Sequence, residues 1–252
     1  MKRADDRLTL TAISAIACVL QDVLHEGLGH GVTAWFSGAH HLTISTVALQ
    51  SDISTRWISA NGTLVNLVFG SIFWLLLRKP TRYNPSWRYF LILATAGNFF
   101  TGTGYFLFSG VANFGDWAAV IQGLRPHWLW RLGLVLLGLI SYYGSMLLVA
   151  AELDPFRAGL RRLTWTPYFT EGTLAALGGL VNPLGLFYVL VSALPSTLGA
   201  NAGLLALPSV MPRKSRAEQV EIISRSWAWI AAGAVIALFF IIVLGRGISW
   251  SR

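Results

Sequence analysis

Long apolar stretches separated by short polar segments dominate this chain. A helix needs about 20 mostly apolar residues to cross a bilayer, and six stretches meet that requirement. We expect spanning helices at residues 8–30, 57–77, 89–112, 128–151, 172–194 and 227–245. Residues 195–209 are also apolar but are interrupted by glycine and proline, which suits a re-entrant element or a seventh crossing. Because no long linker or repeat is present, the pattern predicts an all-α polytopic membrane protein with one domain, residues 1–252.

One segment departs from the helical pattern. His41 to Leu49 (HLTISTVAL) is rich in β-branched residues and partly alternates, which is typical of a short strand or hairpin. Open sheet edges cannot face lipid. We therefore expect this segment within the protein or at the membrane surface, just after the first span.

The composition supports the membrane assignment. Hydrophobic residues make up 54% of the chain and charged residues 12%, whereas about a quarter of an average soluble domain is charged. These values exclude a disordered chain, a fibrous repeat and an ordinary cytosolic enzyme. A single cysteine, Cys18, excludes an intramolecular disulfide.

The net charge of +8 would suggest nucleic-acid binding in a soluble protein. Here the basic residues lie in short loops beside apolar stretches, so we expect the bilayer, and not nucleic acid, to be their partner. Six spans place twelve Lys and Arg on the side of both termini and seven on the other. The positive-inside rule then predicts a cytosolic N-terminus, as in a bacterial inner-membrane protein. The basic stretch 213–225 falls on the opposite side and suggests a short amphipathic surface helix.

The first span ends in a cluster of ionisable side chains. Asp22, His25, Glu26 and His30 lie within nine residues, and ionisable groups inside a membrane are costly and usually functional. His25 is about 25 Å along the helix from Leu8. The cluster therefore lies near the far end of this span.

The spacing of the cluster is close to a metal-binding signature. In HExxH helices two histidines one turn apart bind zinc and the glutamate activates water, but here the second histidine is at i+5, giving HExxxH. On a regular α-helix these side chains are about 140° apart. A π-bulge would realign His25 with His30, and Gly27 and Gly29 make that distortion inexpensive. Alternatively, the helix loosens at Gly29 and His30 folds back toward His25.

The same region resembles the site-2 protease family of intramembrane zinc metalloproteases. The resemblance runs from Val23 to about Gly70 and comprises VLHEGLGHGVTAWFSGA, the strand-like HLTISTVAL, and SANGTLVNLVFG. It implies that His25 and His30 ligate Zn²⁺, that Glu26 is the general base, and that Asn66 lies close to the site. It also implies a site toward the cytosolic face, in conflict with the charge count.

A zinc site of this kind needs a third protein ligand, usually a carboxylate. Family members supply an Asp within an Asn-Pro…Leu-Asp-Gly motif; here Asn182-Pro183-Leu184-Gly185 matches only its first half. Asp116 and Asp154 are the remaining candidates. Asp116 follows the third span at the same end as His25, whereas Asp154 falls at the other end, so we expect Asp116 to be the ligand.

Four further residues are candidates for supporting the ligands or contacting substrate. Asp22 lies one turn before His25, Asn66 and Asn98 lie inside the second and third spans, and Asn182 belongs to the partial motif. A ligating histidine usually donates its other N–H to an oxygen, which these side chains offer. They could also merely bridge helices by hydrogen bonds, and Asp116 could simply begin a helix.

Three functions fit these features. The first is a membrane-embedded zinc metallopeptidase that cleaves membrane-spanning protein substrates, with Glu26 acting on zinc-bound water. The second is an inactive relative that binds metal or membrane partners without cleaving them. The third is a metal-ion or proton transporter.

Overall fold

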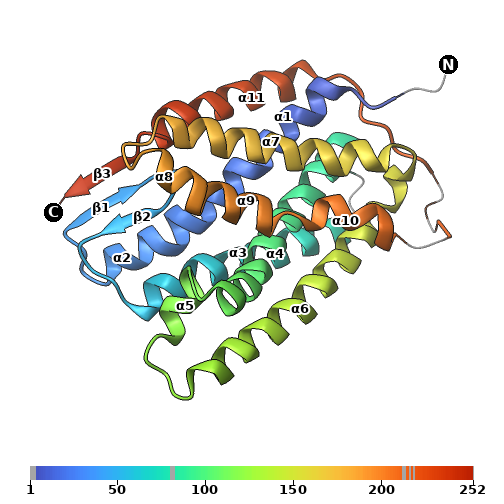
Figure 1. Ribbon diagram of the computed structural model, residues 1–252. Helices are drawn as coiled ribbons and strands as arrows, with labels where there is room; N and C mark the ends of the chain where they lie inside the picture. Colours follow the sequence, from blue (N-terminus) through green and yellow to red (C-terminus); the bar gives the residue numbers. More distant parts are fainter. Residues whose placement is uncertain (1–3, 80–82, 212–213, 216, 218, 252) are drawn as a thin grey trace.

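Seven helical passes run between the two ends of the molecule in the part of the chain that the computed structural model describes (Figure 1). The described residues are 4–79, 83–211, 214–215, 217 and 219–251. The passes are α1–η1–α2 (Arg7–Asp22, Val23–Gly31, Val32–Phe36), α3 (Arg56–Arg78), α4 (Pro85–Ala112), α6 (His127–Glu152), α7 (Leu160–Leu180), α8–η3–α9–α10 (Leu186–Tyr188, Val189–Ala193, Leu194–Ala200, Gly203–Val210) and α11–η4 (Trp227–Phe239, Phe240–Leu244). Shorter elements are α5 (Asp116–Ile121) and the 3₁₀ helix η2 (Asp154–Gly159).

Six of these passes are long and apolar enough to span a membrane, which confirms the all-α polytopic fold. The spanning stretches agree with expectation except for the fifth. The predicted span 172–194 is wrong, because the chain turns at 181–185 between α7 and α8. Pro183 and Gly185, whose φ is 83°, end the helical path there.

The remaining pass, α7, is the fifth along the chain and does not look like a span in the sequence. It contains Arg161, Arg162, Glu171 and Pro167, yet it runs the length of the bundle (Figure 1), packed against α1, α9 and α10. Its 21 residues extend about 31 Å, enough to cross the hydrocarbon core of a bilayer. The apolar stretch that follows it therefore forms a crossing of its own.

An odd number of passes places the two ends of the chain at opposite ends of the bundle. At the N-terminal end, the Ile223 amide donates to Asp5 Oδ1 (2.9 Å) and the Glu221 amide to Pro155 O (2.9 Å). At the other end, Asn182 Nδ2 donates to Gly245 O (2.9 Å). The segment 214–225 thus lies at the same end as the N-terminus, and the C-terminal segment lies at the opposite end. Six spans had predicted the reverse for both segments.

The stretch 213–225 is also not an amphipathic helix in its described residues. Its backbone groups bond to neighbouring segments instead, as when Asp6 N–H donates to Ile223 O (2.8 Å). Arg213 and Arg216, which contributed to that expectation, lie outside the described residues.

A small antiparallel sheet lies at the end opposite the N-terminus, which we call the sheet end. Strands β1 (His41–Ile44) and β2 (Leu49–Ser51) form the expected hairpin, with Thr43 opposite Gln50. A strand that the sequence did not indicate, β3 (Ile248–Ser251), pairs with the other edge of β1. The order β2-β1-β3 leaves one edge of β2 unpaired within the described sheet.

Local sequence signals begin several helices. Asp6 Oδ1 accepts from Thr9 N (3.0 Å) at the start of α1, and Asn84 Oδ1 accepts from Trp87 N (3.0 Å) at the start of α4, where Pro85 is the first residue. The main core gathers around α4, where Tyr89 and Phe100 are fully buried. This packing holds α4 between α3 and α6 and orients its C-terminal half toward the sheet end.

Candidate metal site

Residues Val23–Gly31 are wound as a π-helix, which is one of the two distortions expected to align histidines at i+5 spacing. Nε2 of His25 and Nε2 of His30 are 3.2 Å apart, and both side chains are buried. A regular α-helix would direct them about 140° apart. The π winding therefore turns HExxxH into a pair of imidazoles on one face.

Glycines on two helices make room for this pair. A Cβ on Gly29 would lie 2.5 Å from Gly62 Cα and 2.9 Å from Asn61 O, so η1 and α3 approach each other backbone to backbone. A Cβ on Gly62 would meet the His30 ring and lie 2.8 Å from His25 Cε1. Only a residue without a side chain fits at position 62 while both imidazoles keep these positions.

Asp116 completes a group of three converging atoms. Its Oδ2 lies 3.3 Å from His25 Nε2 and 3.4 Å from His30 Nε2; we call these three atoms the donor triangle. A tetrahedral zinc ion about 2.0–2.2 Å from its donors requires them to lie about 3.3–3.6 Å apart. The donor triangle has nearly that size, so its residues fit a zinc ion.

Hydrogen bonds orient both imidazoles toward the centre. His30 Nδ1–H donates to the backbone oxygen of Ile58 (2.6 Å) and His25 Nδ1–H donates to Asn66 Oδ1 (2.6 Å). Asn66 Nδ2 in turn donates to Asn98 Oδ1 (2.8 Å), and Asn98 Nδ2 donates to Ala94 O (2.8 Å). With Nδ1 protonated, each neutral imidazole presents a lone pair at Nε2.

Two such lone pairs and a carboxylate oxygen repel one another unless a cation lies between them. Burial acts to raise the pKa of Asp116. Charge interaction with His30 and hydrogen bonds with both histidines lower it by a larger amount, so the net pKa is well below its usual range. The carboxylate is therefore ionised. A proton on a histidine or a divalent metal ion provides the required positive charge.

Glu26 lies beside the donor triangle. Its carboxylate and the two imidazoles place ligand-type atoms within 4.8 Å of one another. The closer and mutually oriented atoms are those of the donor triangle, so Asp116 is the better third ligand. Glu26 Oε2 is buried and has no hydrogen-bond partner among the described residues, which leaves it free to accept a proton.

A cavity of about 300 Å³ opens at this cluster. Glu26, His30 and Asp116 line one part of it, and the hairpin residues Leu49 and Ser51 line another. Strand β2 therefore borders the cavity that contains the donor triangle.

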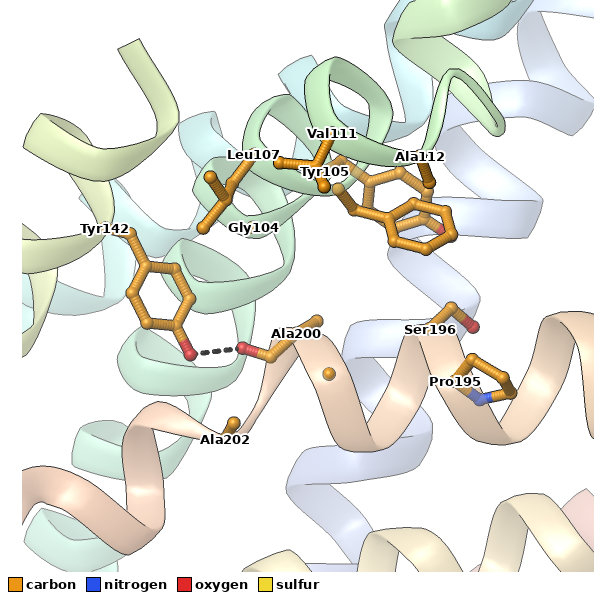
Figure 2. Close-up of a pocket in the computed structure, with 12 residues that line it drawn as sticks. Gly104, Tyr105, Leu107, Val111, Ala112, Tyr142, Pro195, Ser196, Ala200 and Ala202 are labelled. Carbon is orange, nitrogen blue, oxygen red and sulfur yellow. Dashed lines mark hydrogen bonds between the residues drawn. The ribbon is translucent and has the colours of Figure 1, made fainter. Parts of the chain in front are cut away.

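A second, apolar cavity of about 520 Å³ lies next to the first, between α4, α6 and α9. Figure 2 shows Tyr142 on one side, with its hydroxyl donating to Ala200 O (2.6 Å), and Pro195 and Ser196 on the other. Tyr105, Phe108 and Ser196 line both cavities. The Tyr105 ring also stacks on His25, with centroids 4.9 Å apart.

The structure places the other sequence candidates as follows. Asn66 and Asn98 belong to the hydrogen-bond chain behind His25. Asp22 interacts electrostatically with Glu26, but its side chain makes no hydrogen bond within the described part of the chain. Asn182 instead stabilises the turn 181–185, where it accepts from Leu184 N (2.9 Å) and donates to Gly245 O. Asp154 lies at the opposite end, paired with Arg157 (2.7 Å).

Sequence reasoning missed Gly62, Tyr105 and Glu171. Gly62 belongs to the small-residue stretch SANG, which could have indicated a close helix approach. Tyr105 carried no signal beyond its aromatic character. Glu171 did carry a signal, because it is the lone acidic residue of the mainly uncharged helix α7. Searches among protein-family models, curated proteins and solved structures found no match to this chain.

Proposed function

We propose that this chain is a membrane-embedded zinc metallopeptidase. The single observation that supports it best is the donor triangle, which has the size of a tetrahedral zinc site and has Glu26 beside it. Bound zinc would lower the pKa of a coordinated water and polarise the scissile carbonyl. His25, His30 and Asp116 would hold the ion.

The roles of the remaining residues follow from their positions. Glu26 accepts a proton from the attacking water and delivers it to the leaving amine; its unpartnered, buried Oε2 suits that exchange. The hydrogen-bond chain through Asn66 keeps His25 Nε2 directed at the donor triangle. Tyr105 restricts the movement of the His25 ring by stacking on it.

The substrate we propose is a segment of a membrane-spanning protein. A peptide must be extended for its carbonyl to be attacked, and the free edge of β2 offers backbone pairing to an extended chain. The apolar cavity beside the site would accept an apolar side chain of that segment. Both features adjoin the donor triangle.

We also propose an orientation. Nine described basic residues lie at the N-terminal end and four at the sheet end; the four are Arg56, Arg125, Arg131 and Arg246. The positive-inside rule places the more basic end in the cytosol. The donor triangle would then face the non-cytosolic side, in a membrane such as a bacterial inner membrane.

Replacing Glu26 with Gln tests the proposal. We expect the variant to bind zinc as the wild type does, at one ion per chain, but to cleave single-span reporter proteins in liposomes at least about 100-fold more slowly. Elemental analysis measures the zinc, and gel analysis measures cleavage. A His25→Ala variant, expected to lose zinc, is the control for the metal measurement.

The outcomes separate the enzyme from a non-catalytic relative. Zinc-loaded wild type that cleaves no reporter would support a relative that binds membrane partners only. Wild type that cleaves without zinc, or a Glu26→Gln variant with wild-type rate, would contradict the proposed mechanism.

One observation favours a cation or proton transporter as the second candidate. Glu171 is 4% exposed inside α7, and its Oε2 has no hydrogen-bond partner in the described part of the chain. It interacts electrostatically with Cys18, which lies two helical turns before His25. A buried carboxyl group is therefore present deeper in the bundle than the donor triangle. Zinc uptake by proteoliposomes that Glu171→Gln abolishes would favour this function.

A further inference from the structure

A basic cavity lies at the N-terminal end of the bundle, far from the donor triangle. Its volume is about 800 Å³, and Arg157, Arg161, Arg162 and Trp165 line it. All four belong to η2 or to the first turns of α7. The cavity is therefore built where a helix begins, at the end of the molecule that carries most of the basic residues.

Two of the arginines have N–H groups available for a ligand. The Arg161 guanidinium stacks over the Trp165 ring at 4.1 Å, and its N–H groups have no acceptor among the described residues. Among the described residues, Arg162 donates only from Nη1, to Asp5 O (3.3 Å). Stacking on tryptophan fixes the plane of Arg161 while leaving its donor edge open.

The start of α7 adds to the positive potential. Gly159 precedes the helix and provides no side-chain cap, so the first N–H groups of the helix have no side-chain acceptor from the capping residue. The helix dipole places partial positive charge at this point. Arg161 and Arg162 are in the first turn of a 21-residue helix.

Two acidic residues also line the cavity, and each has one carboxylate oxygen engaged by another group. Asp5 Oδ1 accepts from the Ile223 amide (2.9 Å), and Glu221 Oε1 pairs with Arg88 Nη1 (2.9 Å). Arg157 pairs with Asp154 (2.7 Å). Arg161 and Arg162 are left as the charges best placed to attract an anion.

We propose that this cavity binds the phosphate of an anionic phospholipid. Arginine suits phosphate because its fork of donors matches two phosphate oxygens. Tryptophan and arginine at the end of a membrane bundle lie at the depth of lipid headgroups. The proposal is independent of the peptidase activity, since none of these residues contacts the donor triangle in the described structure.

Native mass spectrometry of the purified full chain tests this site. We expect wild type to retain phosphatidylglycerol over phosphatidylcholine of the same acyl chains. Arg161→Gln combined with Arg162→Gln should reduce the retained phosphatidylglycerol at least about tenfold. The matched control, Arg125→Gln with Arg246→Gln, removes the same charge from the sheet end and should retain the lipid.

Competition with glycerol 3-phosphate and inorganic phosphate distinguishes a lipid from a soluble phosphate. Displacement of the lipid by either compound at equal concentration would overturn the lipid assignment. Equal retention of both lipids by wild type, or equal loss in the control variant, would overturn the site. If the glutamine variant does not fold, Arg161→Lys with Arg162→Lys keeps the charge and should still prefer the anionic lipid, but with reduced retention.

Discussion

Asn66 determines which nitrogen of His25 faces the donor triangle. Both hydrogens of its amide are used, toward Gln21 O (3.3 Å) and Asn98 Oδ1 (2.8 Å). Its oxygen must therefore accept the proton of His25 Nδ1. The His25 tautomer with its proton on Nδ1 has a free lone pair on Nε2. Ligation of a metal ion through Nε2 requires this tautomer.

We expect Asn66→Ala to weaken zinc binding about 10–100-fold, because His25 loses the acceptor that fixes its tautomer and ring orientation. Competition with a fluorescent chelator measures the affinity. Asn61→Ala is the matched control on the same helix, since Asn61 bonds to Thr33 Oγ1 (2.8 Å) and not to a histidine. Equal affinity of wild type and Asn66→Ala would show that this hydrogen bond does not support the site.

The packing of η1 against α3 brings the two histidines of the HExxxH pattern together. The π winding brings His25 and His30 together only because Gly29 and Gly62 let the two backbones meet. Alanine at position 62 would overlap both imidazoles. The candidate metal site and the helix contact thus depend on the same pair of small residues.

Gly62→Ala should therefore abolish zinc binding while the helices remain folded. Elemental analysis and circular dichroism measure the two properties. Gly133→Ala is the control, because a Cβ on Gly133 meets no atom within 4 Å and the change should only strengthen helix α6 slightly. A Gly62→Ala protein that keeps one zinc per chain would contradict the close fit described for the two rings.

The course of the whole chain places the donor triangle, the sheet and the C-terminal segment at one end. Asp116 comes from α5, and β3 arrives from the last residues to pair with β1. This arrangement requires α7 to be a pass, so that the final helix ends beside the site. The count of passes is thus open to direct measurement.

Single cysteines distinguish seven passes from six. In a Cys18→Ala background, we expect an impermeant maleimide to label Arg246→Cys and Arg125→Cys from one side of the membrane, and Lys214→Cys and Ala158→Cys from the other. Six passes, with a span at 172–194, would exchange the sides of positions 214 and 246. The background protein without cysteine should remain unlabelled.

The sequence by itself determined the membrane class, five of the seven passes, the hairpin and a histidine spacing at HExxxH that a π-bulge would align. These features are local: a span, a strand or a helical register is encoded within a few turns of chain. It indicated Asp116 over Asp154 only through the order of the spans. Asn182, in contrast, was selected from a partial motif, and it stabilises a turn away from the donor triangle.

Only the tertiary structure decided the rest. The pass α7 carries charged residues that a hydropathy pattern assigns to a loop, yet neighbouring helices bury Glu171 and most of the helix remains in the bundle. Likewise β3 and the contact of Gly62 with the imidazoles join residues far apart in the chain. Such contacts depend on which elements become neighbours. A buried charge or a missing side chain lowers stability, and only the partner that packing places beside it offsets this loss.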